Sequence, residues 1–201
     1  MAALAGNAKS YAERLFNYPQ MGPLEPTAAQ AALVHPAEHE GVKFQQAAVA
    51  EILRATQGYP YFLQEWGFHV WNAALKSPIR GADVERVTPE IVAHLDANFF
   101  RVRFDRLTTL QQKYLRAMAE LGPGPHKTGD IATALGVETA SISTVRQQLI
   151  DKGMIWSQRY GETSFTVPMF DTFMKRQMPM LEKHEPKHRR VARKSRKGNR
   201  K

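Results

Sequence analysis

The chain has 201 residues, 43% of them hydrophobic, which is enough for one medium-sized domain or two small ones with a packed core. No apolar run approaches the length of a membrane span, and the first residues lack the basic and long apolar segments of a signal peptide. Because the chain has no cysteine, disulfides, thiolate catalysis and zinc fingers are excluded. We therefore expect a cytoplasmic protein with no membrane partner.

The formal net charge of +9 is concentrated at the C-terminus. Residues 183–201 contain ten Lys or Arg residues and one acid, Glu185, so the rest of the chain is neutral as a whole. This tail has few apolar side chains to bury, and we expect it to be disordered and to bind DNA phosphates by releasing counterions. Its candidate DNA contacts are Lys187, Arg189, Arg190, Arg193, Lys194, Arg196 and Lys197.

Helical periodicity predicts a small all-helical bundle over residues 1–100. The expected helices cover residues 2–16, 26–34, 45–56, 60–75 and 89–100. Thr88 is a typical N-cap residue, and Pro89 suits the first turn of the helix that follows it. We expect Pro36 to end the second helix, because proline removes a backbone donor and clashes with the preceding turn.

Stronger boundary signals follow in the second half. Thr108 and Gln111 fit a capping box for a helix with Leu110 facing inward, Thr128 is a candidate cap for a second helix, and Gly136 suits a tight turn. We expect helices over residues 109–120, 130–135, 141–152 and 169–178, and strands over residues 154–158 and 163–167. This order is that of a winged helix-turn-helix, and the alternative is three unrelated helices with a separate hairpin.

These elements predict a mainly α fold in three parts. Residues 1–100 form a helical bundle, and residues 101–180 form a winged helix-turn-helix with a small β-hairpin. Residues 181–201 form the basic tail. The hairpin is the only β-structure that the sequence leads us to expect.

No catalytic motif accompanies this fold. The chain contains no phosphate-binding loop, no dinucleotide-binding glycine motif, no zinc-protease motif and no nucleophile elbow. Its seven histidines are scattered, and although His35 and His39 are four residues apart, Pro36 lies between them. We expect His35 and His39 to be solvated loop residues rather than metal ligands. The sequence therefore predicts a chain that is not an enzyme by itself and has no metal site.

The expected recognition helix offers polar side chains that could reach base edges or phosphates in a major groove. They are Ser141, Ser143, Thr144, Gln147 and Gln148, with Arg146 as the main cation. Arg159, at the tip of the expected hairpin, is either a further phosphate contact or a solvated turn residue. Winged helices also dock on proteins, and Glu138 and Asp151 reduce the positive field, so protein docking is the alternative to DNA contact.

Five further cations occur close together in the sequence and could make one basic patch. They are Arg101, Arg103, Arg106, Lys113 and Arg116. Asp105 interrupts this set, and a solvated helix face is the equal alternative.

One segment resembles a known family. Gly58-Tyr59-Pro60, within residues 56–64, is similar to the Gly-x-Pro segment in the lid subdomain of bacterial AAA+/STAND-type ATPases, relatives of the origin-recognition initiators. Residues 11–16, 23–24 and 104–108 are similar to stretches that follow the nucleotide-binding core of this family. The resemblance covers roughly residues 5–178 and implies a helical lid followed by a winged helix. From its residues alone, the same segment is a kinked connection beside a packed aromatic core.

The resemblance implies that Pro60 lies against the adenine or ribose of a bound nucleotide, with Gly58 and Tyr59 beside it. Arg14 would support the junction between lid and core. The phosphate loop, the acidic metal-binding strand and the sensor strand of the family all precede this region, so ATP and Mg²⁺ would bind only with an upstream ATPase core. A fragment, a split gene product and a stand-alone descendant are the alternatives.

We therefore expect a non-catalytic lid and winged-helix module that contacts DNA through the winged helix and the basic tail. The alternative is a regulatory module that docks on an ATPase core or on another protein without reading DNA.

Overall fold

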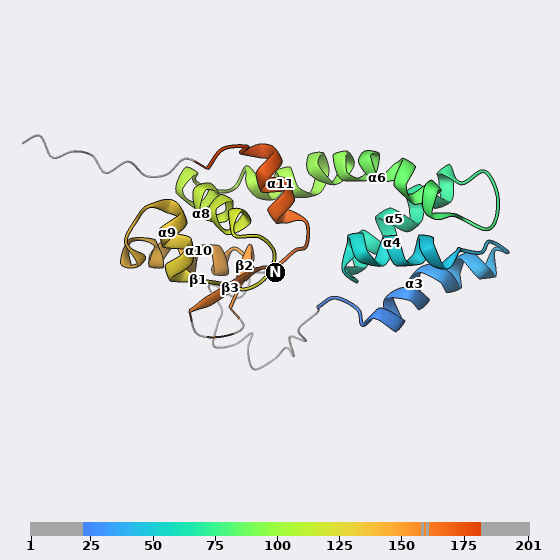
Figure 1. Cartoon of the computed structure of the whole chain (residues 1–201), viewed down its shortest axis with the longest axis horizontal. Coiled ribbons are helices and arrows are strands. Elements are labelled where there is room, and N and C mark those ends of the chain that lie inside the picture. Colours follow the sequence, from blue (N-terminus) through green and yellow to red (C-terminus); the bar gives the residue numbers. More distant parts are fainter. Residues whose placement is uncertain (1–21, 158, 160, 182–201) are drawn as a thin grey trace, which may run out of the picture.

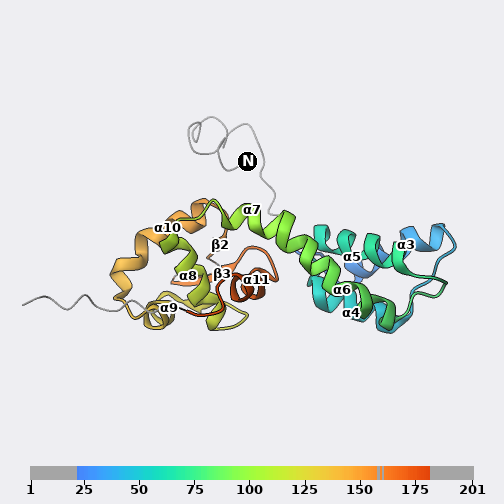
Figure 2. The same cartoon turned by 90° about the horizontal axis from the view of Figure 1, so that it is seen from above.

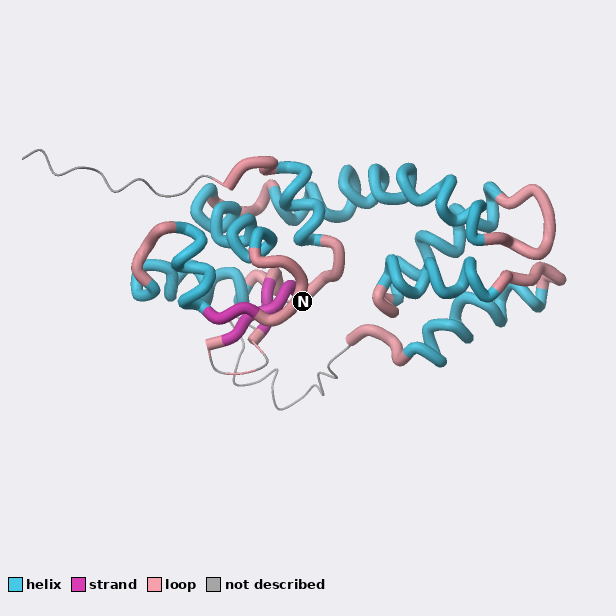
Figure 3. The backbone as a smooth tube through the Cα atoms, viewed as in Figure 1, coloured by secondary structure: helices cyan, strands magenta, loops and turns pink. Residues whose placement is uncertain are grey.

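The computed structural model describes residues 22–157, 159 and 161–181. The helix expected over residues 2–16, Arg14 and the candidate DNA contacts of the tail lie outside the described residues. The described part is mainly helical with one small antiparallel sheet, as the sequence predicts (Figures 1 and 3). None of its helices is long and apolar enough to cross a membrane.

Four helices form the bundle at the right of Figure 1. They are α3 (Pro26–His39), α4 (Gln46–Thr56), α5 (Pro60–Ala73) and α6 (Gly81–Leu95). Each helix turns an apolar stripe inward, and Ile52, Phe62, Trp66 and Ile91 are fully buried between them. Burial of this stripe is the main source of helix stability in a bundle of this kind.

Pro36 does not end α3, so that prediction is wrong. The helix continues through Pro36 to His39. Leu33 and Ala37, on either side of the proline, are buried in the bundle, whereas Pro36 itself is exposed. Tertiary packing of the flanking residues therefore outweighs the lost backbone hydrogen bond.

The start of α6 also differs from the prediction. The helix begins at Gly81, where the Asp83 carboxylate accepts a hydrogen bond of 3.0 Å from the Arg80 backbone N–H. Thr88 is not an N-cap residue: its hydroxyl donates to the Val84 carbonyl at 2.8 Å, inside the helix. Pro89 likewise lies within α6 rather than at its first position.

The end of α6 continues into η1 (Asp96–Phe100), a π-helical turn, and then into α7 (Arg101–Phe104). Together they make one long helical rod along the top of Figure 1, and Figure 2 shows it running between the bundle and the second half. The boundary predicted between residues 100 and 101 therefore falls within continuous helix.

The second half has the predicted order of a winged helix-turn-helix. Its strands form one antiparallel sheet in the order β1-β3-β2, with His126 opposite Thr163 and Ile155 opposite Phe165. Its elements are α8 (Thr109–Glu120), β1 (His126–Lys127), α9 (Thr128–Leu135), η2 (Thr139–Ile142), α10 (Ser143–Asp151), β2 (Ile155–Trp156), β3 (Glu162–Phe165) and α11 (Phe170–Gln177).

Two local signals in this half are confirmed. Thr108 accepts a hydrogen bond from the Gln111 backbone N–H at 3.3 Å, and the Gln111 side chain accepts one from the Thr108 N–H at 3.1 Å. Gly136 ends α9 in the left-handed conformation, with φ of 71°. Both features depend on a few neighbouring residues, so the sequence is sufficient to predict them.

Three details of this half differ from the prediction. The strand β1 was not predicted from the sequence. Thr128 is the first residue of α9, and its hydroxyl donates to the Gly161 carbonyl at 3.1 Å instead of capping the helix. Leu110 is half-exposed, whereas Gln111 is buried and donates to the Gln148 side chain at 3.0 Å.

Gly58 shapes the entry to α5. Its φ is +73°, and its carbonyl accepts a hydrogen bond of 2.9 Å from the Leu24 N–H. A Cβ at this position would lie 2.5 Å from the Leu24 carbonyl oxygen. Only glycine therefore allows the chain before α3 to approach the turn before α5 so closely.

We predict that Gly58→Ala lowers the free energy of unfolding by about 1–3 kcal/mol, because alanine is strained at positive φ and meets Leu24. Urea unfolding followed by circular dichroism measures this loss. Gly129→Ala is the control, since its Cβ would have no atom within 4 Å and its φ is not positive. Equal stabilities of the two variants would contradict the prediction.

Candidate nucleic-acid interface

The outward face of η2 and α10 carries uncharged polar side chains. Ile142, Val145 and Leu149 are buried against the rest of the second half, and this fixes which face of the helix meets solvent. The exposed residues include Ser141, Ser143, Thr144 and Gln147, all of which were predicted DNA contacts. The structure thus brings four of the predicted residues onto one surface.

Several polar groups of this face already have local partners. The Ser141 hydroxyl donates to the Glu138 carbonyl at 2.6 Å, and the Ser143 hydroxyl donates to the Thr139 carbonyl at 3.3 Å. The Gln147 amide donates to the Asp151 carboxylate at 2.9 Å. Each donor would have to exchange its partner to bind a base, and the side-chain oxygens remain acceptors.

Arg146 does not belong to this outward face. Its guanidinium Nη2 donates to the Ser157 hydroxyl at 3.0 Å and to the Glu162 carbonyl at 3.5 Å. The side chain is half-buried, and its Nε has no hydrogen-bond partner among the described residues. Arg146 therefore ties α10 to the hairpin. The sequence had instead predicted Arg146 to be the main cation of a DNA-reading face.

The hairpin between β2 and β3, the wing, is held at its base and exposed at its tip. The Gly161 carbonyl accepts hydrogen bonds from the Thr128 N–H at 2.9 Å and from its hydroxyl at 3.1 Å. Arg159, at the tip, is exposed, and its carbonyl accepts a hydrogen bond from the Glu162 N–H at 3.1 Å. The Arg159 side chain thus faces solvent from a residue whose carbonyl is hydrogen-bonded to Glu162.

The five cations near α7 and α8 do not form one patch. Arg116 is buried, and its guanidinium binds the Met178 carbonyl at 2.6 Å and the Glu120 carboxylate at 2.7 Å. Arg101 lies 3.9 Å from the Asp105 carboxylate and donates to the Gln177 side chain at 2.7 Å. These two arginines hold helices and the C-terminal segment together.

Two others, Arg103 and Arg106, line a basic cleft with Lys152 at the C-terminal end of α10. The cleft has a volume of about 480 Å³, and none of the described residues that line it is acidic. The Arg103 guanidinium lies 3.7 Å from the Phe99 ring centroid. Burial lowers the pKa of Arg103; the interaction with Tyr59 opposes this shift, and the positive charge of Arg106 adds to it to a smaller extent. An anion such as a phosphate would relieve this repulsion.

Lys152 was not among the predicted contacts, although it follows α10 directly. Its ammonium donates to the Arg106 carbonyl at 2.9 Å and to the Gln111 side chain at 2.8 Å. These bonds place Lys152 beside the two arginines. Its place directly after α10 was the one signal in the sequence that could have pointed to Lys152. The sequence could not show which residues it contacts, because its hydrogen-bond partners are 41 and 46 residues away.

The residues predicted to contact a nucleotide lie at the start of α5. Gly58 is buried, and Tyr59 is half-buried against Phe62, with ring centroids 5.0 Å apart. Pro60 lines a cavity of about 550 Å³ between α3 and α5, together with Leu33, Trp71 and other mostly apolar residues. None of the described residues that line this cavity is a cation, so its described walls offer no positive side chain that would hold phosphates.

Residues 97–174, from η1 into α11, match a family described as a domain of unknown function (DUF8462). No curated protein matches the chain.

Among solved structures, RuvB from Thermotoga maritima is similar at 17% identity. One mutant of RuvB matches over 78% of this chain and 50% of that chain, with a TM-score of 0.36. The RuvB Holliday junction branch migration motor matches over 77% and 50%, with a TM-score of 0.35. The chain therefore spans about half the length of these proteins, and the likeness is coarse.

We predict that Arg146→Ala lowers the free energy of unfolding by about 1–3 kcal/mol, because it removes charge-assisted hydrogen bonds that join α10 to the wing. Arg159→Ala is the control, since an exposed side chain of this kind changes stability by only about 0.5 kcal/mol. Urea unfolding of both variants measures the difference. Equal small losses would show that Arg146 does not hold the wing.

Proposed function

We propose that this chain is a non-catalytic module that contacts DNA through its winged helix. The observation that carries the proposal is the exposed polar face of η2 and α10, with the wing held beside it by the bond from Arg146 to Ser157. A duplex that receives α10 in its major groove would also meet Arg159 at the wing tip. Uncharged side chains such as Thr144 and Gln147 would then face base edges.

Positive charge for phosphate binding comes from outside this face. The basic cleft of Arg103, Arg106 and Lys152 lies at the C-terminal end of α10. In the proposed complex it would receive a phosphate of the backbone. Residues 183–201, with ten basic side chains, would add sequence-independent affinity. In this proposal the winged helix positions the protein on the duplex and the tail supplies most of the electrostatic attraction.

The resemblance of Gly58-Tyr59-Pro60 to the lid segment of AAA+ ATPases extends the proposal to a second partner. An ATPase core would supply the phosphate loop, the Mg²⁺ ligands and the hydrolysis. Pro60 would then contribute an apolar surface for the base or ribose from its cavity. Because the described residues around that cavity include no cation, the core would hold the phosphates.

A second candidate function is docking on a protein without contact to DNA. One observation favours it: Arg146 is the sole cation in α10, and it faces the wing. Glu138 and Asp151 flank the exposed polar face and make its field less positive. An uncharged face of this kind suits a protein partner as well as a base edge.

The contributions of the tail and of the winged helix to DNA binding can be distinguished by how the affinity depends on salt concentration. We predict that the full chain binds a fluorescent duplex of mixed sequence, with affinity falling steeply as salt rises. A chain ending at residue 182 would bind more weakly on all sequences, with a flatter slope, since each lost phosphate contact reduces the slope by about 0.9. Fluorescence anisotropy at several salt concentrations measures both. If the shortened chain shows no binding at low salt, the protein-docking function is favoured instead.

The wing has its own test in the full chain. We predict that Arg159→Ala weakens binding and reduces the salt slope by about 1, as expected for one lost phosphate contact. Arg54→Ala is the matched control, because it removes the same charge from an exposed site on α4, in the bundle. An Arg159→Ala variant that behaves like the control would show that the wing does not touch DNA.

A further inference from the structure

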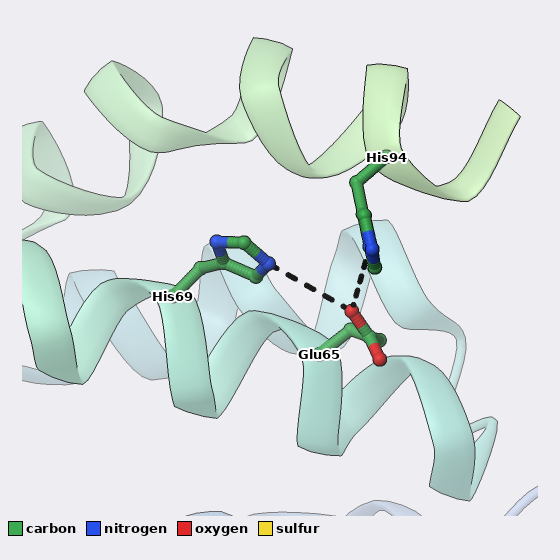
Figure 4. A group of neighbouring side chains, drawn as sticks. All are labelled: Glu65, His69 and His94. Atoms are coloured by element: carbon green, nitrogen blue, oxygen red, sulfur yellow. Dashed lines mark ion pairs between the residues drawn. The ribbon is translucent and has the colours of Figure 1, made fainter. Parts of the chain in front are cut away.

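Two helices of the bundle bring together three side chains that commonly bind metal ions. Glu65 and His69 lie one turn apart on α5, and His94 faces them from α6 (Figure 4). The Glu65 carboxylate Oε2 lies 3.3 Å from His94 Nδ1 and 3.8 Å from His69 Nε2. The three ligand atoms all lie within 4.8 Å of one another.

The fold fixes this arrangement. Residues four apart on a helix share a face, so Glu65 and His69 point the same way from α5. Trp66, beside Glu65, is fully buried and donates its indole N–H to the Thr88 hydroxyl on α6 at 3.3 Å. This contact and the buried stripe between the helices hold α6 against α5, which places His94 opposite the pair.

The separations of the three ligand atoms are close to those found around a bound metal ion. At 3.8 Å, the His69 nitrogen is too far from the carboxylate for a hydrogen bond. Neighbouring ligand atoms around tetrahedral zinc are about 3.3 Å apart, because zinc–nitrogen and zinc–oxygen bonds are about 2.0–2.1 Å. Glu65 and His94 already have this separation, and small side-chain rotations would bring in His69.

We propose that Glu65, His69 and His94 bind a zinc ion. Two imidazoles and one carboxylate are a common zinc ligand set, and water would fill the fourth position. The side chains of Glu65 and His69 are 18% and 20% exposed and that of His94 is 44% exposed, so an ion can enter from solvent. Bound zinc would clamp α5 to α6 and stabilise the bundle.

Tyr61 supports the carboxylate from one turn earlier on α5. The Tyr61 hydroxyl interacts with the Glu65 carboxylate. Such outer partners orient a ligating carboxylate and strengthen metal binding. Tyr61 itself is stacked on Phe99, with ring centroids 5.0 Å apart, so the position of its hydroxyl is set by packing.

The test is a zinc titration of the untagged full chain after treatment with a chelator. We predict that calorimetry shows one zinc per chain at this site and that the melting temperature rises with added zinc. Glu65→Gln and His94→Ala would each lower the affinity by at least about tenfold, since even outer-shell partners contribute this much. In both variants the zinc-dependent rise in melting temperature would be lost.

Two controls separate this site from other histidines. His39→Ala removes an exposed histidine at the end of α3 and should bind zinc like the unmodified chain. A double variant of His184 and His188, both in the tail sequence, should keep the rise in melting temperature. Zinc binding that survives Glu65→Gln and His94→Ala but is lost in the double variant would overturn the proposal.

Cobalt gives a readout that does not depend on stability. We expect Co²⁺ to bind the unmodified chain with the visible absorption bands of a tetrahedral ion, and zinc to displace it. If His94→Ala does not fold, His94→Gln serves in its place, because it keeps the size of the side chain. The absence of both cobalt bands and zinc binding in the unmodified chain would also overturn the proposal.

Discussion

The burial of Phe100 is the interaction on which the rest of this structure depends. It lies at the end of the π-helical turn, and its ring centroid is 5.8 Å from that of Phe62 in α5 and 5.7 and 5.2 Å from those of Phe170 and Phe173 in α11. One fully buried side chain therefore joins the bundle, the long rod and the winged helix. Aromatic contacts of this kind add to the free energy of area burial, and removing Phe100 would open a cavity where all three parts meet.

Charge is unevenly distributed over the surface of the winged helix. The exposed polar face of η2 and α10 is uncharged, because the Arg146 side chain points to the wing and donates a hydrogen bond to Ser157 there. Positive side chains lie at the edges of this face, in Arg159 and in the basic cleft, where the Lys152 ammonium already donates to the Arg106 carbonyl and the Gln111 side chain. In the proposed complex, base contacts and phosphate contacts are therefore made by different elements, with the tail as an independent source of attraction.

Local signals were enough to predict most of the fold, and long-range contacts account for what was missed. Thr108 and its partner three residues later form the predicted cap, since both groups lie within one turn. Pro36 was predicted to end its helix, but the burial of neighbouring residues keeps the helix intact. Helix signals in the local sequence do not show which residues are buried. The side chain of Arg146 was predicted to face DNA, and this was wrong because its hydrogen-bond partners lie 11 and 16 residues away in the sequence. His69 and His94 are 25 residues apart, so only the packing of α5 on α6 brings them together.

The central claim is that the winged helix itself contacts DNA. The most direct measurement is hydrogen–deuterium exchange of the full chain with and without a saturating duplex, read by mass spectrometry at peptide level. The account predicts slower exchange over residues 139–151 and at the wing around Arg159, with smaller changes across α3 and α4. Slower exchange confined to residues 183–201, with the winged helix unchanged, would contradict it and leave the tail as the sole DNA contact.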